Sequence, residues 1–171
     1  MKIAYNQGCT LKNSSLEKDI VLCEKAGFDY IEIRAESLRD YLKSRSLQAL
    51  KATFDGLRLK PYTLNGPCIY DGFLLDGDAG EVHGKTMAEL EFLLEACREL
   101  SIPGLIVMPP KYERSEGKEF TKPWAEYLSG AVATFRCLAD MAVRRGGIHI
   151  GLEPVGTTRC AVPTIEKARE L

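Results

Sequence analysis

Five short runs of strand-forming residues recur along this chain, and each is followed by a run with helical periodicity. The predicted strands are residues 2–6, 29–34, 60–65, 104–108 and 148–153. The predicted helices are residues 15–26, 47–57, 81–100, 124–145 and 163–171. A strand that is joined to the next through a helix pairs with it in parallel, by a right-handed crossover. The repeat therefore predicts an α/β fold built on a parallel sheet.

Two architectures contain such a repeat: a doubly wound open sheet and a (β/α)8 barrel, which needs about 250 residues for all eight units. The first strand runs into Asn6-Gln7-Gly8-Cys9-Thr10, which lacks the glycine spacing of a nucleotide-binding loop. The sequence also stops at Leu171 inside a predicted helix, without a capping residue. We therefore expect a single domain over residues 1–171 that corresponds to about the first five βα units of a (β/α)8 TIM-type barrel.

The charge balance excludes several classes of partner. Lys and Arg number 23 and Asp and Glu number 24, so the net charge is −1. Such a chain has no bulk attraction for nucleic acid or for an acidic membrane. No apolar run approaches the roughly 20 residues of a membrane span, and the N-terminus turns polar too early for a secretory signal. We expect no nucleic-acid or membrane partner.

The cysteines indicate the cellular compartment. Six are scattered along the chain without a CxxC pair or a Cys/His cluster. We expect reduced, mostly buried thiols in a cytoplasmic protein, because the chain is not a short secreted domain. Cys23, Cys97 and Cys137 fall on predicted helices, where we expect them to act as small apolar core residues.

Alternation along the strands predicts which side chains meet inside the barrel. Successive strand residues face the lumen and the helices in turn. The outward set is expected to contain Ile3, Tyr5, Ile31, Ile33, Tyr62, Leu64, Ile148, Ile150 and Leu152. The inward set then contains the polar residues Asn6, Glu32, Arg34, Asn65 and Glu153 near one rim. Glu153 is followed by Pro154, which ends the strand at the edge where barrel enzymes carry their chemistry.

Each of these polar residues also has a structural alternative. Glu32 and Arg34 could form an ion pair within the lumen, and Asn6 and Asn65 could satisfy backbone groups of the loops. His149 lies one layer below Glu153, where we expect it to belong to the core. The residues alone leave these alternatives open.

Several segments in the right order carry a family resemblance. Residues 151–171, with GLEPVG followed by CAVPTIEKAREL, resemble the fifth βα unit of bacterial inosose (2-keto-myo-inositol) isomerases. Those enzymes are members of the xylose isomerase-like superfamily of sugar phosphate isomerases and epimerases. MKIAYNQGCTLKNSSLEKDIVLCEKAGFDYIEIR resembles the first unit and second strand of the family, and KPYTLN resembles the third strand.

The resemblance implies a metal-dependent isomerase or epimerase of a sugar or cyclitol that works through an enediolate. It implies a divalent metal (Mn, Co, Mg or Zn) held by a Glu after strand five and by an Asp, a His and a Glu after strands six to eight. Glu153 matches the first ligand and is the expected acid/base residue. Asn6, Glu32, Arg34 and Asn65 are expected to bind substrate hydroxyls. The other three ligands have no counterpart up to Leu171, so we expect weak metal binding, or none, by these residues alone.

Two other functions remain to be weighed. Endonuclease IV shares the superfamily's fold, but the charge balance and the absence of a basic stripe disfavour DNA repair. A non-catalytic α/β remnant is the main alternative. It would bind a ligand, or assemble with another copy or a complementing chain that covers its open sheet edges.

Overall fold

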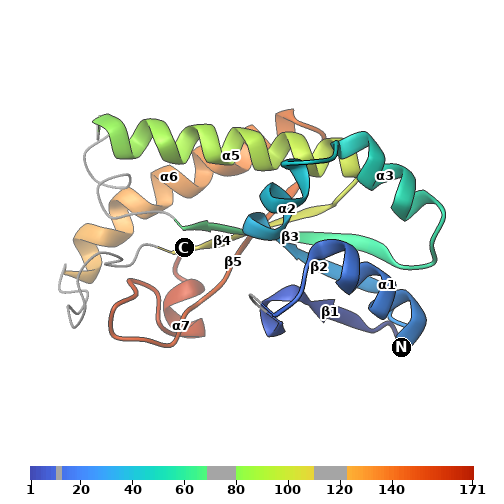
Figure 1. Ribbon diagram of the computed structural model, residues 1–171. Coiled ribbons are helices and arrows are strands. Elements are labelled where there is room, and N and C mark those ends of the chain that lie inside the picture. The colour runs from blue at the N-terminus through green and yellow to red at the C-terminus, as the bar shows by residue number, and fades with distance from the viewer. Residues whose placement is uncertain (11–12, 69–79, 110–122) are drawn as a thin grey trace.

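A parallel five-stranded sheet forms the centre of the molecule (Figure 1). The computed structural model describes residues 1–10, 13–68, 80–109 and 123–171. The strands are β1 (Ala4–Asn6), β2 (Tyr30–Arg34), β3 (Lys60–Cys68), β4 (Gly104–Met108) and β5 (His149–Leu152). Their order in the sheet is β1-β2-β3-β4-β5, and every neighbouring pair is parallel.

Helices connect the strands. They are η1 (Gln7–Cys9, a 3-10 helix), α1 (Leu16–Ala26), α2 (Ala35–Leu42), α3 (Leu47–Asp55), α5 (Gly80–Leu100), α6 (Trp124–Arg144) and α7 (Ile165–Ala168). Helix α5 packs on β3 and β4, α6 packs on β5, and α1 and α2 pack on β2. No helix in the described part of the chain combines the length and hydropathy of a transmembrane span.

Burial is strongly different on the two faces of the sheet. Ile31 and Ile33 of β2 are fully buried against the helices, as are Leu105 and Val107 of β4. On the other face, Glu32 and Arg34 of β2 and Ile106 and Met108 of β4 are only partly buried. A doubly wound sheet buries both faces and reverses its strand order at a switch point. The sequential order and the one-sided core are therefore those of a barrel wall, as the sequence predicts.

Capping side chains and a glycine set the ends of several helices. The Ser15 side chain caps α1 by accepting from the backbone N–H of Lys18, and Gly27 ends α1 in the left-handed conformation with φ of 87°. Thr164 caps α7 in the same way, through the N–H of Lys167. The second unit differs from the prediction because it contains α2 as well as α3. Helix α2 is short, and its buried Ala35, Leu38 and Tyr41 recur at a spacing of three.

A bulge in β3 overturns one assignment to the outward face. Ile31 pairs with Pro61 but Glu32 pairs with Thr63, so the register shifts by one residue between them. Pro61 therefore takes the buried position that the simple alternation gives to Tyr62. Tyr62 is 50% exposed, and its ring lies 5.0 Å from the ring of Tyr30. Thr63 and Asn65 keep the inward direction that the alternation predicts.

Two further core assignments are wrong. Cys137 is exposed, because it precedes the buried Leu138 and so lies off the buried face of α6. His149 is also exposed at the start of β5, on the face away from the helices. Cys23 and Cys97 are buried as predicted. Burial raises the pKa of Cys23 to about 11 and that of Cys97 to about 12, so both thiols stay protonated.

Two carboxylates hold the strands together at their N-terminal ends. Asp29 accepts the backbone N–H of Ile3 at 2.9 Å and an Arg58 guanidinium N–H at 3.2 Å. Glu24 accepts the backbone N–H of Leu59 at 2.8 Å. These backbone hydrogen bonds lower the pKa of both carboxyl groups.

The lowered pKa of Asp29 predicts a pH-dependent stability. Its contribution is present above the unfolded-state pKa of about 3.9 and is lost as the pH falls through the lower folded-state pKa. We expect Asp29→Asn to be less stable than wild type at pH 7 and to lose less stability than wild type between pH 5 and pH 3. Urea midpoints at pH 7, 5 and 3 measure this.

The matched control is Asp140→Asn, which changes an exposed aspartate on α6. Its urea midpoints should parallel those of wild type. If the urea midpoints of Asp29→Asn also parallel those of wild type across this range, the hydrogen bonds of ionised Asp29 do not stabilise the fold as proposed.

Candidate functional site

The C-terminal ends of the strands meet around a cavity of about 440 Å³. It is lined by Asn6, Gly8, Cys9, Arg34, Glu36, Asn65, Gly66, Met108 and Glu153. Four of the five polar residues predicted from the alternation therefore share one cavity. The fifth, Glu32, does not line it.

Glu32 is partly buried, and three side chains bind its carboxylate. Its Oε1 accepts from Nδ2 of Asn6 at 2.6 Å and from Nδ2 of Asn65 at 2.9 Å. Its Oε2 accepts from Oγ1 of Thr63 at 2.7 Å. Both oxygens are thus engaged within the protein. The predicted role of Glu32 in binding substrate directly has no support in this geometry.

Asn65 connects Glu32 to Glu153. Its Nδ2 donates to Oε1 of Glu32 and also to Oε2 of Glu153, the latter at 3.1 Å. Glu153 itself is exposed and follows directly after β5. Its backbone N–H still donates to the carbonyl of Val107 in β4, so the sheet positions this residue.

Arg34 does not pair with Glu32. Its guanidinium Nη2 lies 3.2 Å from Oε2 of Glu36, the second residue of α2. The predicted alternative of an ion pair within the lumen is therefore wrong. Glu32 and Arg34 lie two residues apart on one strand face, and three neutral donors already surround Glu32. Arg34 remains 28% exposed at the cavity wall.

Asn6 binds a backbone group of the following loop, which is the structural alternative that the sequence left open. Its Oδ1 accepts the backbone N–H of Gly8 at 2.6 Å and so caps η1, while its Nδ2 donates to Glu32. Its amide is engaged on both sides. Within the described part of the chain, the Asn65 side chain forms hydrogen bonds through Nδ2 alone, to two side chains rather than to loop backbone.

A buried polar cluster supports this rim, and sequence reasoning missed it. Gln7 and Asp19 are 1% and 3% exposed. Oδ2 of Asp19 accepts from Nε2 of Gln7 at 3.0 Å and from Oγ1 of Thr10 at 3.2 Å. Oε1 of Gln7 accepts the backbone N–H of Arg34 at 3.1 Å. No sequence spacing links these residues, because the contacts join a 3-10 turn, a helix and the end of the neighbouring strand.

The close approach of β3 to α2 was also missed. A Cβ at Gly66 would collide with the Cβ of Ala35, so only glycine lets the strand pass the start of α2 here. Gly66 lines the cavity with Met108 and Cys9. A lone glycine after a predicted strand is compatible with this role, but gives no spacing by which to assign it.

The donor set limits what metal chemistry these residues support. Among the side chains that the structure describes, no group of three or more His, Cys, Asp or Glu is placed to hold a metal ion. Glu36 is paired with Arg34, and Glu32 is engaged by its three donors, which leaves Glu153 as the carboxylate open to the cavity. One carboxylate does not complete the coordination sphere of a hard divalent ion.

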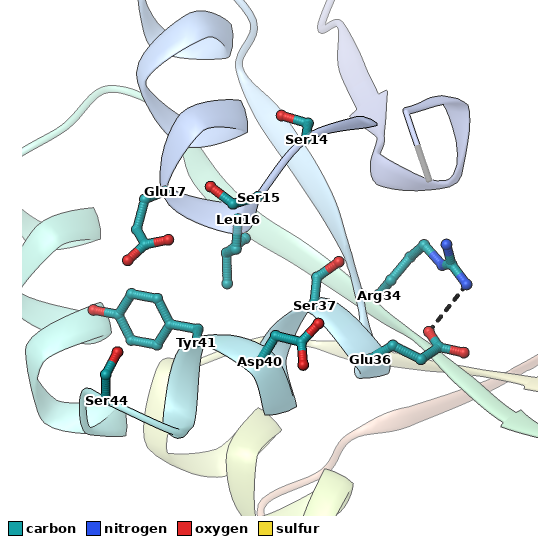
Figure 2. A pocket seen from close by; sticks show the side chains of 10 residues that line it. All are labelled: Ser14, Ser15, Leu16, Glu17, Arg34, Glu36, Ser37, Asp40, Tyr41 and Ser44. Atoms are coloured by element: carbon teal, nitrogen blue, oxygen red, sulfur yellow. Dashed lines mark ion pairs between the residues drawn. The ribbon is translucent and has the colours of Figure 1, made fainter. Parts of the chain in front are cut away.

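A second cavity of about 540 Å³ lies between the start of α1 and α2 (Figure 2). Arg34 and Glu36 also line this cavity, where Figure 2 shows their ion pair. The other two carboxylates of its lining are paired as well, Glu17 with Arg45 at 3.3 Å and Asp40 with Lys43 at 2.7 Å. Its carboxylates are therefore already neutralised, whereas Glu153 in the rim cavity is not paired with a cation among the described residues.

Known proteins are similar to this chain over most of its length. A family model described as "Xylose isomerase-like TIM barrel" matches residues 20–171. An inosose isomerase of Bacillus velezensis is 35% identical over 173 residues, which cover 100% of this chain and 57% of that protein. An inosose isomerase of Bacillus subtilis is 34% identical over 172 residues, which cover 100% of this chain and 58% of that protein.

Solved structures are similar over the same span. A crystal structure of IolI protein with a bound zinc atom superposes with a TM-score of 0.87 at 34% identity, covering 99% of this chain and 57% of that one. A D-psicose 3-epimerase of Clostridium cellulolyticum gives a TM-score of 0.73 at 18% identity, covering 99% and 60%, and shows likeness of fold alone. This chain spans little more than half the length of the curated relatives that it matches.

Proposed function

The chain belongs to the xylose isomerase-like TIM barrel family, and from this premise we propose that its rim is part of the active site of a cyclitol or sugar isomerase or epimerase. An inosose is the favoured substrate, since the relatives at 34–35% identity are inosose isomerases. The observation that carries the proposal is the exposed Glu153 carboxylate, which the sheet and Asn65 position at the rim cavity. Family enzymes hold their chemistry at this end of the strands.

In the proposed reaction, Glu153 takes the proton from the carbon next to the substrate carbonyl. The electron pair of that C–H bond becomes the carbon–carbon double bond of an enediolate, and the carbonyl π electrons move onto oxygen. Return of the proton to the neighbouring carbon, with transfer of the hydroxyl proton, gives isomerisation. Epimerisation keeps the proton taken up by Glu153 off that carbon and requires a second acid, outside the described residues, to protonate the opposite face of the first carbon.

The other cavity residues bind the substrate in this proposal. The Arg34 guanidinium is the cation at the wall, and the Asn65 amide carbonyl is a hydrogen-bond acceptor. Hydroxyls of a polyol donate to such oxygens and accept from such guanidinium groups. Neutral and hydroxylated compounds therefore suit the cavity better than anions with several charges, because Glu153 and Glu36 also line it.

Zinc in the IolI structure makes a divalent metal the expected cofactor of the proposed enzyme. Glu153 is the described residue we propose as a ligand. It does not form a metal site by itself, and the remaining ligands would have to come from residues other than those described.

The experiment uses the protein as its gene encodes it. We expect incubation with 2-keto-myo-inositol in D₂O, with Mn²⁺ or Co²⁺ added, to place deuterium next to the carbonyl and to form an isomeric ketone. Proton NMR detects both changes, and the position of the label separates isomerisation from epimerisation. Absence of exchange and turnover with keto-inositols and ketoses would contradict the proposal and favour a non-catalytic binding or assembly role.

A further inference from the structure

Glu32 is the one predicted site residue that the cavity does not contain, yet it is the most heavily hydrogen-bonded of the five. Donors from β1 and β3 converge on its carboxylate: Asn6 at 2.6 Å, Thr63 at 2.7 Å and Asn65 at 2.9 Å. Bonds from neutral donors to an ionised carboxylate are stronger than those between neutral groups. The carboxylate therefore holds the side chains of two neighbouring strands in fixed orientations.

We propose that Glu32 is a positioning residue that acts on the substrate through Asn65. This rests on the function proposed above. Glu32 holds the Asn65 amide so that its Nδ2 faces the carboxylates and its Oδ1 is left to accept a hydroxyl of the substrate. Glu32 thereby determines that the site recognises a hydrogen-bond donor, a hydroxyl, at this position.

The electrostatics of the amide support one orientation. Nδ2 of Asn65 donates to Glu32 at 2.9 Å and to Glu153 at 3.1 Å, so its two protons are directed toward two carboxylates. A flipped amide would place Oδ1 against both carboxylates and lose both bonds. The trigonal amide directs Oδ1 away from Nδ2, and Asn65 lines the cavity, so Oδ1 is the polar atom left for a ligand.

Glu32 also separates the roles of the two asparagines. Asn6 is engaged on both sides of its amide, by Glu32 and by the N–H of Gly8, and has a structural role. Asn65 donates to the same Glu32 oxygen, but its side-chain carbonyl has no hydrogen-bond partner among the described residues. The specificity-determining contact is therefore expected at Asn65 and not at Asn6.

A double-mutant cycle tests the coupling. We expect Glu32→Ala to lower kcat/KM on inosose roughly 10-fold, chiefly through KM, since a hydrogen bond to the substrate is lost. In an Asn65→Ala background the same change should cost less than about twofold, because the group through which Glu32 acts is gone. Losses that multiply in the double variant would overturn the proposal.

Glu32→Gln is the conservative variant and keeps the test valid if Glu32→Ala does not fold. Its Oε1 can still accept from both asparagines, and its amide nitrogen can donate to the Thr63 hydroxyl. We expect kcat/KM to remain within about threefold of wild type, so that glutamine rescues most of the alanine defect. A glutamine variant as impaired as the alanine variant would contradict a role that depends on Oε1 as an acceptor.

A second readout needs no substrate. The side-chain NH₂ signals of Asn65 in a ¹⁵N–¹H correlation spectrum, assigned by their loss in Asn65→Ala, should shift in Glu32→Ala. They should shift far less in the matched control Thr63→Val, which removes a donor from the other oxygen of the same carboxylate. Equal shifts in the two variants would overturn the positioning role. If wild type turns over no substrate, the proposed function fails. This spectrum then tests by itself whether Glu32 orients the Asn65 amide.

Discussion

Glu153→Gln should lower kcat on inosose by about 100-fold or more, because a positioned general acid/base contributes roughly 10²- to 10⁴-fold. Glutamine keeps the size of the side chain, and its Oε1 can still accept from Nδ2 of Asn65, as Glu153 does at 3.1 Å. It cannot take up a proton from carbon. The defect should therefore lie in kcat and in deuterium exchange at the carbon next to the carbonyl.

The stability of this variant should change little. Glu153 is exposed, and substitutions of exposed residues usually change the free energy of unfolding by about 0.5 kcal/mol or less. Glu126→Gln is the matched control, since it makes the same charge change at an exposed position on α6. It should leave kcat unchanged, and its thermal midpoint should fall only slightly, because Glu126 lies in the first turn of α6 and favours the helix dipole there. A Glu153→Gln enzyme within threefold of wild-type kcat would contradict the assigned role.

Asp19→Ala should lower the free energy of unfolding by about 2–4 kcal/mol, because it leaves the buried Gln7 amide without its charged acceptor. Gln7 is 1% exposed and loses the partner of its Nε2, and the Thr10 hydroxyl loses the same oxygen. Gln7 also accepts the N–H of Arg34, so the disturbance should reach the cavity wall. Urea unfolding measures the loss.

Asp40→Ala is the matched control for that measurement. Asp40 lies on α2 and pairs with Lys43 at 2.7 Å while both side chains remain exposed. Exposed pairs are typically worth less than about 1 kcal/mol, so we expect a small effect. For Asp19→Asn, which keeps one acceptor oxygen, the loss in free energy of unfolding should lie between the losses for Asp19→Ala and Asp40→Ala. Equal losses for Asp19→Ala and Asp40→Ala would mean that the cluster around Gln7 is not a main support of the rim.

Most of the polar residues at the C-terminal edge of the sheet could be predicted, because the face on which a strand residue lies depends only on local sequence spacing. In β2, Ile31 and Ile33 are buried as alternation requires, and this places Glu32 and Arg34 on the opposite face. Pro154 cannot continue the fifth strand, which ends at Leu152 and leaves Glu153 directly after it. The family resemblance, which the match over residues 20–171 confirms, agrees with the barrel fold inferred from the repeat.

The partners of these side chains could not be predicted in the same way. Alternation gives the face on which a residue lies, but not the neighbouring strand's register or the group opposite. The bulge at Pro61 changes the face of Tyr62, and the pairing of β2 with β3 brings Thr63 and Asn65 to Glu32. Arg34 forms an ion pair with Glu36 because the chain turns directly from β2 into α2, a helix not assigned from the sequence.

The sequence by itself thus determined the order of strands and helices, the apolar face of the sheet and the polar residues that reach its C-terminal edge. These properties follow from local spacing, which a chain keeps whatever its neighbours are. Only the tertiary structure decided that Glu32 is enclosed by three donors while Glu153 stays open to the cavity. That difference arises from contacts between residues far apart in the chain, as in the bond from Asn65 to Glu153, which are separated by 88 positions.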